Sequence, residues 1–385
     1  MEICMLKGGV NMIAPKLRFK ADDGNDFPEL EAKSLFDICE YRNKQSVGKN
    51  YVGTENMKQN FSGLESLDEE TEMKGVCYSK GDTLMSNIRP YLRKTWKADR
   101  EGVCSTDVLV FHPIDVASEY LHYLIASDKF ISYVMTGAKG VKMPRGDKEH
   151  MMKFSIMVPS LPEQQKIADF LSTIDTIIEK QQATVSAWEE RKKGVMQKLF
   201  SQEVRFKADD GSDFPDWEEK EVKDVCSVAT GKSNTQDKVD SGKYEFYVRS
   251  PIVEHSDKYL FDEEAVITVG DGVGTGKVFH YVNGKYNLHQ RCYRMYDFMG
   301  VIGKYFFYFF SQNFYRRIKA MSAKTSVDSV RMEMITKMKM NVPSLPEQQK
   351  IADCLSALDT VIQKQKETLE KWQELKKGLL QQMFV

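Results

Sequence analysis

The chain has 385 residues, of which 41% are hydrophobic and 11% aromatic, and its formal net charge at pH 7 is −1. This length and composition suit two globular domains with connecting structure, and the balanced charge requires any basic surface to be local. The seven cysteines never form a C-x-x-C pair, which argues against a zinc ribbon or a disulfide framework and favours a reducing cytoplasm. No apolar run approaches the roughly 18–20 residues that a membrane-spanning helix needs.

The chain opens with a segment, residues 1–16, that could form a flexible leader. Residues 1–11 lack both the basic start and the long apolar stretch of a signal peptide, and Met12 could be the true start. The block Arg18–Gly24, which reads RFKADDG, comes next and recurs letter for letter as Arg205–Gly211. A block that is used twice indicates an internally duplicated chain.

Two inserts of similar length, roughly 40–157 and 227–341, differ in sequence from each other. Short strands and turns alternate in both, each contains one helical period, and each ends in a polar loop, so we predict a mixed α+β fold. In the first insert the predicted elements are Tyr51–Asn56, Gly81–Tyr91, Val108–Phe111, the helical Tyr120–Val134 and the loop 136–150. In the second they are Gly231–Asn234, Ala265–Val269, the glycine-rich Gly270–Gly276, Val278–Tyr281, the helical Gly303–Met321 and the loop 322–331.

A second repeated block, Val158–Asp169, opens a long helix after the first insert and returns as Val342–Asp353 after the second. In each copy a serine followed three residues later by a glutamate, Ser160 with Glu163, predicts a capping box, and the proline between them suits a first helical turn. Apolar residues then recur at steps of four and three, a heptad seam sustained over about four to five repeats. The seam residues are Ile167, Leu171, Ile174, Ile178 and Trp188 in the first copy, and Ile351, Leu355, Leu358, Ile362 and Trp372 in the second.

Such a helix would expose its seam if it stood alone, so we expect the two copies to pair as an antiparallel coiled coil. About 38 residues make a helix on the order of 57 Å long, and an antiparallel pair would place the inserts at opposite ends of the rod. The first helix runs directly into the second RFKADDG block, whereas the second helix ends at the C-terminus. We therefore expect the N-terminal block to dock near the C-terminus and the two chain ends to be close in space.

The sequence motifs of phosphate-binding, metal-binding, nuclease and methyltransferase sites are absent or incomplete. The glycine-rich Gly270–Gly276 is not a phosphate-binding loop, because Asp271 stands where a glycine is required and Val278 where Ser or Thr is required. The six histidines form no H-x-x-x-H pair, which disfavours a metal site. Glu31–Lys33 and Glu218–Lys220 faintly resemble a nuclease E-x-K motif, although charged surface at a repeated turn is the better interpretation. An Asn-Pro-Pro-aromatic tetrad is absent, so we expect neither a base-methylating centre nor any other catalytic residue.

Basic and hydrogen-bonding side chains remain in the glycine-flanked loops, close to aromatic residues. Arg can read guanine and Asn adenine, while Lys and Ser more often contact phosphates, so these loops are candidate DNA-binding surfaces. An ordinary solvated position is the alternative for each residue taken singly. The candidates are Arg89, Tyr91, Arg93, Lys94, Lys139, Lys142 and Arg145 in the first insert, and Lys232, Ser233, Asn234, Arg249, Lys277, Lys324 and Arg331 in the second.

The whole pattern resembles the DNA-specificity subunit of type I restriction–modification systems. The resemblance is carried by the repeated VPSLPEQQKIAD at 158–169 and 342–353, by Tyr51–Met57 and Gly81–Tyr91, and by the repeated RFKADDG block. It implies a first target-recognition domain at 17–157, a first spacer helix at 158–203, a second recognition domain at 204–341 and a second spacer helix at 342–385.

The resemblance also implies a role and a set of partners. Each recognition domain would read one half of an asymmetric bipartite site in double-stranded DNA, and the helices would fix the spacing and dock two methyltransferase subunits. Restriction subunits would join them. S-adenosylmethionine, ATP and Mg would be used by the partner subunits, and this chain would hold no cofactor. The alternative is a coiled-coil adaptor whose inserts bind proteins; a nuclease that uses the E-x-K stretches is a distant third.

Overall fold

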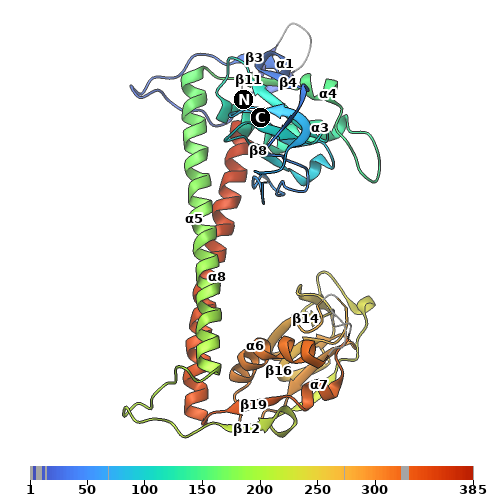
Figure 1. Ribbon diagram of the computed structural model, residues 1–385, viewed down its shortest axis with the longest axis vertical. Helices are drawn as coiled ribbons and strands as arrows, with labels where there is room; N and C mark the ends of the chain where they lie inside the picture. Colours follow the sequence, from blue (N-terminus) through green and yellow to red (C-terminus); the bar gives the residue numbers. More distant parts are fainter. Residues whose placement is uncertain are drawn as a thin grey trace. The chain divides into compact units, whose positions relative to one another are not determined.

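The computed structural model describes residues 3–5, 11–13, 15–67, 69–272, 274–321 and 329–384. The chain forms two compact units, and the bounds of each unit differ from those of the domains expected from the sequence. Unit 1 combines Met1–Gln182 with Glu367–Val385, and unit 2 is Ala183–Lys366. Each unit therefore contains one mixed domain together with parts of both long helices (Figure 1).

Unit 1 contains four small antiparallel sheets among its described residues, and they pack with short helices; one of them is the pair of β1 (Ile3–Met5) and β2 (Asn11–Ile13). The four-stranded sheet has the order β4-β10-β7-β8, the three-stranded sheet β5-β6-β9, and β11 pairs with β3. The strands are β3 (Glu31–Ser34), β4 (Cys39–Arg42), β5 (Gln45–Gly48), β6 (Met73–Tyr78), β7 (Thr83–Ser86), β8 (Thr95–Lys97), β9 (Gly102–Cys104), β10 (Val108–Pro113) and β11 (Ser155–Val158). The helices are α1 (Leu35–Ile38), the 3-10 turn η1 (Pro90–Leu92), α2 (Ser118–Ile125), α3 (Asp128–Thr136) and α4 (Lys148–Met152).

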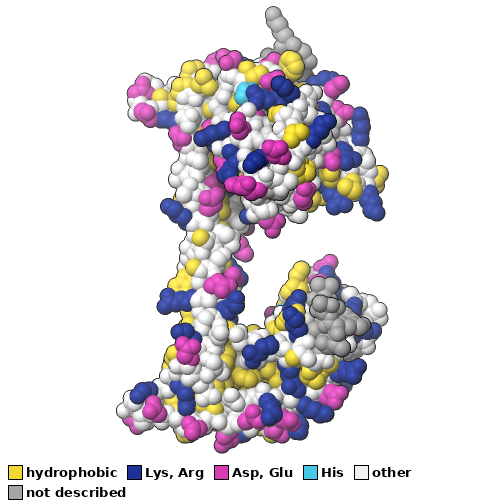
Figure 2. Space-filling model, in the orientation of Figure 1, with side chains coloured by type: hydrophobic (Ala, Val, Ile, Leu, Met, Phe, Trp, Pro, Cys, Tyr) yellow, Lys and Arg dark blue, Asp and Glu magenta, His cyan; other side chains and the backbone are white. Residues whose placement is uncertain are grey.

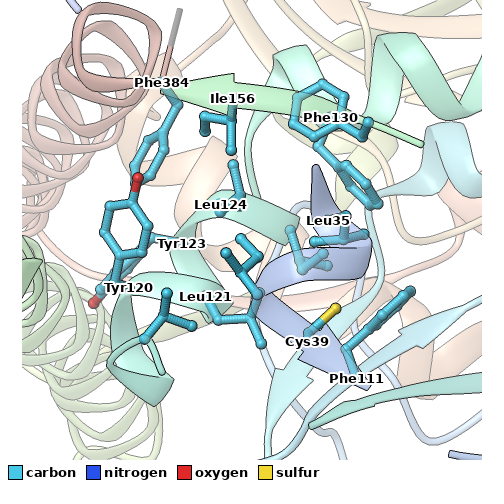
Figure 3. Packing of buried hydrophobic residues seen from close by; sticks show 14 of the residues in the cluster. Leu35, Cys39, Phe111, Tyr120, Leu121, Tyr123, Leu124, Phe130, Ile156 and Phe384 are labelled. Carbon is cyan, nitrogen blue, oxygen red and sulfur yellow. The ribbon is translucent and has the colours of Figure 1, made fainter. Parts of the chain in front are cut away.

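The main core of unit 1 forms where α2 meets the sheets and the end of the last helix. Figure 3 shows Leu121 and Leu124 of α2 facing Leu35 of α1, while Tyr120 points toward Phe384. The rings of Tyr120 and Phe384 lie 5.4 Å apart, and both side chains are buried. The C-terminal end of the chain is therefore part of the core of unit 1.

The helical period predicted over Tyr120–Val134 is present, but it forms two helices instead of one. The hydroxyl of Ser127 accepts a hydrogen bond from the backbone N–H of Phe130 at 3.2 Å, and this cap starts α3. Ser127 is buried, so the chain turns here with its polar groups satisfied. The apolar spacing indicated the helical residues, whereas the break depends on this one serine.

Unit 2 is built on one six-stranded mixed sheet of order β13-β18-β16-β17-β14-β15, and β12 pairs with β19 beside it. Helix α6 (Gly303–Met321), with the bounds predicted from the sequence, buries Tyr305, Phe306, Phe310 and Phe314 in the core. The strands are β12 (Glu218–Glu221), β13 (Ser227–Thr230), β14 (Tyr244–Tyr247), β15 (Glu254–Ser256), β16 (Phe261–Val269), β17 (Phe279–Leu288), β18 (Cys292–Tyr296) and β19 (Lys339–Val342). Short helices η2 (Val222–Asp224), η3 (Thr235–Asp237) and α7 (Met332–Thr336) complete the domain.

Two long helices, α5 (Leu161–Phe200) and α8 (Leu345–Met383), connect with these domains (Figure 1). Within unit 1, Asp175 of α5 pairs with Lys376 of α8; within unit 2, Lys192 pairs with Asp359. In unit 1, Leu171 of α5 shares a core with Leu380, so the helices run antiparallel there. In unit 2, Met196 shares a core with Leu355 in the same way. The predicted seam residues are all buried or half-buried.

The predicted capping box is wrong in both copies. The hydroxyl oxygens of Ser160 and Ser344 are buried without a hydrogen-bond partner among the described residues. Glu163 does not reach back to the helix start, because its carboxylate accepts two hydrogen bonds from Arg18, at 3.1 and 2.6 Å. A bidentate guanidinium forms stronger charge-assisted bonds than a single backbone N–H, so the repeated block displaces the local cap.

The N-terminal block docks on the end of α8, as predicted. The backbone N–H groups of Lys16 and Leu17 donate to the carbonyl of Gln382, at 2.9 and 3.3 Å. The second copy shows the same connection within a continuous chain, where the N–H of Val204 donates to the carbonyl of Lys198. The C-terminal ends of α5 and α8 thus contact the same repeated segment. In α5 this segment follows directly along the chain, whereas in α8 it comes from the N-terminal part of the chain. Within the expected leader, Ile3–Met5 and Asn11–Ile13 pair as short antiparallel strands β1 and β2.

Candidate nucleic-acid interface

Two loops far apart in the sequence meet at one edge of unit 1. Ile88, after β7, forms a β-bridge with Arg145 in the loop between α3 and α4. The N–H of Arg89 donates to the carbonyl of Pro144 at 2.8 Å. The structure therefore brings together the two groups of residues that the sequence suggested separately, Arg89 to Lys94 and Lys139 to Arg145.

The first loop holds two arginines in an unusual backbone conformation. Arg89 and Arg93 flank η1 with φ of 51° and 54°, in the left-handed region that side chains other than glycine rarely adopt. Tyr91 between them is exposed. Arg93 pairs with Asp128 at 2.8 Å, and the ammonium of Lys94 donates to the carbonyl of Thr54. Arg93 and Lys94 thus brace the loop, while Arg89 has no ion pair among the described residues.

The second loop closes on itself. Lys139 and Arg145 exchange two backbone hydrogen bonds, at 2.8 and 2.9 Å. The side chain of Lys139 pairs with Asp147, and that hydrogen bond lowers the pKa of the carboxyl to about 2. Arg145 pairs with Asp107 at 3.1 Å. Lys142 at the tip has no ion pair within the described chain, so it is the unneutralised lysine of this loop.

Unit 2 assembles a corresponding edge around Asp271. Arg249 lies 3.3 Å from this carboxylate, and Arg291 donates to its other oxygen. Burial raises the pKa of the Asp271 carboxyl, but the hydrogen bonds from Arg291 and Arg249 outweigh it and leave the pKa lowered. Arg249 thus lies in a loop cluster with Arg291 and Asp271, and this carboxylate offsets part of its charge.

The other candidate DNA-binding side chains of unit 2 differ in whether they already have a partner within the domain. Ser233 is buried and donates to Asn287 at 2.7 Å, so its hydroxyl is already used inside the domain. Asn234 accepts from Gln290, and Lys277 lies over the ring of Tyr315. Lys232 and Arg331 are exposed without an ion pair in the described part of the chain. Lys324 lies outside the described residues.

The two edges use the same backbone connections. The N–H of Asn87 donates to the carbonyl of Asp107 in unit 1, and the N–H of Gly270 donates to that of Arg291 in unit 2. The bridge from Ile88 to Arg145 corresponds to the bridge from Asp271 to Ser329. Hence the same three segments meet in each domain: a loop after a central strand, a turn before the next strand, and the end of the polar loop. Their side chains differ.

Sequence reasoning missed the turn between β17 and β18. Gln290 and Arg291 sit at its tip, and His289 is buried beside them, where burial lowers the pKa of the imidazole. The signal in the sequence is the polar run His289, Gln290 and Arg291, which lies between the residues of β17 and β18; of these two strands the sequence predicted only the start of the first, Val278–Tyr281.

The mixed domain of each unit is fixed to the helices of that unit by the same three types of side chain. In unit 1, the hydroxyl of Tyr123 donates to Asp175 at 2.8 Å, and Lys376 pairs with that carboxylate while lying over the tyrosine ring. In unit 2, Tyr308, Asp359 and Lys192 repeat the arrangement, with a Tyr–Asp distance of 2.7 Å. The domain edge is therefore held at a set orientation to the helices of its own unit.

On the face shown in Figure 2, Lys and Arg side chains adjoin apolar side chains at the outer edge of unit 1, where Figure 1 draws the loop between α3 and α4. Across the described ranges, the structure contains no group of three or more His, Cys, Asp or Glu side chains that could hold a metal ion. No helix in the described part of the chain is long and apolar enough to cross a membrane.

Comparisons with known proteins agree with this architecture. The family model of the type I restriction modification DNA specificity domain matches the chain twice, at residues 28–186 and 215–371. The type I restriction enzyme MjaVIII specificity subunit of Methanocaldococcus jannaschii is 25% identical over 304 residues, which cover 71% of this chain and 72% of that protein. The type I restriction enzyme EcoDI specificity subunit of Escherichia coli is 26% identical over 166 residues, 43% of this chain and 36% of that protein.

A solved structure shares the fold at low sequence identity. The S subunit of a type I restriction–modification system from M. genitalium superposes with a TM-score of 0.61 and 13% identity, covering 97% of this chain and 99% of that one. The protein-binding adaptor finds no support in these comparisons. Because the family model matches both halves of the chain, the protein belongs to the type I restriction–modification DNA-specificity family, and it is a DNA-specificity subunit.

Proposed function

We propose that the domain of each unit reads one half of an asymmetric bipartite site in double-stranded DNA. The observation that carries this proposal is a contrast within the molecule. The contacts that fix each domain to the helices are the same in both units, whereas the side chains in the loop clusters differ. Tyr123 and Tyr308 fix their domains to the helices in the same way, while the loop tips carry different side chains. A protein that reads two different half-sites needs this combination. Both domains must be held on their helices in the same way, whereas the side chains that contact the bases must differ between the domains.

The helix pair acts as a spacer in this proposal. Half-sites about one duplex turn apart, roughly 34–36 Å, can be contacted from one face only by domains held at a fixed separation. The repeated helix surfaces dock two methyltransferase subunits, and restriction subunits join the complex. The chain itself is non-catalytic and cytoplasmic; S-adenosylmethionine, ATP and Mg serve the partner subunits.

An exchange of one insert tests the proposal directly. Residues 40–157 are replaced by the insert of another specificity subunit, and methylated adenines are mapped across the genome of a host that carries the complex. We expect one half-site to change while the other half and the spacer persist. A change in both halves would contradict modular reading, and an unchanged site would contradict any role of the insert in recognition.

DNA binding by the assembled complex gives a second, independent measurement. Phosphate neutralisation makes affinity fall steeply as salt rises, so a plot of log affinity against log salt should have a clearly negative slope. Affinity that does not depend on salt would contradict a DNA interface built from lysine and arginine loops.

A further inference from the structure

The loop between α3 and α4 carries apolar side chains that are exposed to solvent and do not pack into the core of the domain. Val141 at its tip is fully exposed, and Met143 is 46% exposed. Between them stands Lys142, which has no ion pair among the described residues. Segment 137–146 contains three cations and no acidic residue. An apolar tip within a basic loop costs solubility, so it indicates a contact that the chain alone does not show.

The exposure of Val141 does not result from a loose loop. The paired backbone bonds between Lys139 and Arg145 close the loop at its base, and the bond from Arg89 to Pro144 attaches it to the neighbouring loop. Gly140 has φ of +97°, and a Cβ there would lie 3.3 Å from the carbonyl oxygen of Met143, so the tight turn at the tip favours glycine. The tip is therefore held away from the domain on a braced base.

The charge distribution indicates what the tip contacts. Lys139 and Arg145 are neutralised by Asp147 and Asp107, so they position the loop, while Lys142 and Arg89 keep their charge available. The available cations Lys142 and Arg89 suit a ligand with phosphates, and the apolar side chains of the loop tip suit a ligand that also displays apolar groups close to those phosphates. In duplex DNA that group is the 5-methyl of thymine, which is displayed in the major groove. The major groove, about 12 Å wide, also admits a two-stranded loop that the minor groove, about 6 Å wide, excludes.

We propose that Val141 and Met143 contact a thymine methyl in the half-site read by unit 1, and that Lys142 binds a phosphate beside it. This inference rests on the proposed function. It assigns specificity at one base pair to two apolar side chains, and it assigns sequence-independent affinity to the lysine between them.

The test uses the complex of this chain with its methyltransferase subunits and a duplex that carries the genomic site. Thymines in the half-site of unit 1 are replaced one at a time by uracil, which lacks only the methyl group. At one position we expect affinity of the unmodified complex to fall about fourfold, the effect of burying one methyl group. The double variant Val141→Ser with Met143→Ser should bind both duplexes equally. A uracil effect that persists in this variant, or that is absent at every position, would overturn the inference.

Two further variants separate the roles. Lys142→Ala should weaken binding to all sequences, reduce the salt slope by about one and leave the methylated motif unchanged. Val47→Ser is the matched control, since Val47 is an exposed valine of unit 1 on β5, outside the segment 137–146, and it should change neither affinity nor motif. A motif altered by Lys142→Ala would overturn the assignment of Lys142 to a phosphate.

A further pair of duplexes distinguishes the grooves. Inosine in place of guanine removes an amino group from the minor groove alone. If the unmodified complex were sensitive to inosine but not to uracil, and the Val141→Ser, Met143→Ser variant lost that sensitivity, the loop would lie in the minor groove and the inference would be overturned. If the unmodified complex methylated no specific motif at all, the proposed function would fail, whereas a uracil effect that persists in the Val141→Ser, Met143→Ser variant contradicts only the inference.

Discussion

Units 1 and 2 share a frame and differ at their edges. In both, an arginine of the repeated block pairs with a buried glutamate at the helix start, and a tyrosine of the domain donates to an aspartate of the helix. In contrast, the edge of unit 1 is a braced apolar and basic loop, while that of unit 2 centres on Asp271 with two arginines. The difference indicates that the duplicated residues set position and the unlike residues set the bases that are read.

The largest expected effect comes from changing the helix length in only one copy. Removing Gln181–Thr184 from α5 shortens that helix by about 6 Å and rotates its C-terminal part, with the domain of unit 2, by about 40°. If the helices set the spacing, the preferred DNA spacer should shift or specific binding should be lost, because the seam of α5 no longer matches that of α8.

Mapping of methylated adenines in the host checks this prediction. Replacing Gln181, Gln182 and Thr184 by alanine, with Ala183 unchanged, keeps the helix length and serves as the control, for which the spacer should stay unchanged. An unaltered spacer in the deletion variant, with methylation intact, would contradict the spacing role of the helices.

A smaller effect should result from removing the buried glutamate in either copy. Glu163→Ala leaves Arg18 without its partner, and we expect a loss of about 2–3 kcal/mol in the stability of unit 1, below the range for a fully buried pair because Arg18 is partly exposed. Glu347→Ala should cost about 1 kcal/mol more in unit 2, because Glu347 also accepts a hydrogen bond from the indole of Trp217.

Hydrogen exchange resolved by mass spectrometry reports each unit separately. Protection should fall in 17–28 for the first variant and in 204–216 for the second. Glu190→Ala on the exposed face of α5 is the control, and it should change stability by less than about 0.5 kcal/mol. Equal losses in the two glutamate variants would show that the bond from Trp217 adds nothing.

The sequence was a good guide to the duplicated features and a poor guide to the local ones. Identical letters indicated the paired helices and the docking of the N-terminal block, because those contacts depend on apolar spacing and on residues present twice. The capping box failed since Arg18, distant along the chain, competes for Glu163. In the loops, spacing indicated basic tips, but the sequence did not show which cations are neutralised. That depends on partners such as Asp107 and Asp128, which only folding brings near.

The smallest expected effect concerns the residue before each anchoring tyrosine, which is His122 in unit 1 and Phe307 in unit 2. The pKa of His122 is lowered to about 3, mainly by burial, with smaller contributions in the same direction from Lys376 and Lys97 and an opposite one from Glu119. The unfolded chain binds this proton near pH 6.5, whereas the folded unit does not. Unit 1 should therefore lose stability as the pH falls from 6.5 toward 3, by about 1.4 kcal/mol at pH 5.5.

Exchanging the two residues tests whether this difference between the units is due to the imidazole. His122→Phe should remove the acid sensitivity of unit 1, and Phe307→His should introduce it in unit 2, because the rings beside Tyr123 and Tyr308 occupy corresponding positions at centroid distances of 5.6 and 5.2 Å. The measurement is hydrogen exchange of each unit at pH 5.5 and 7.5. If unit 1 responds to acid equally with His or Phe at position 122, the response belongs to other groups. In that case the two units differ in pH behaviour through their edges and not through their shared frame.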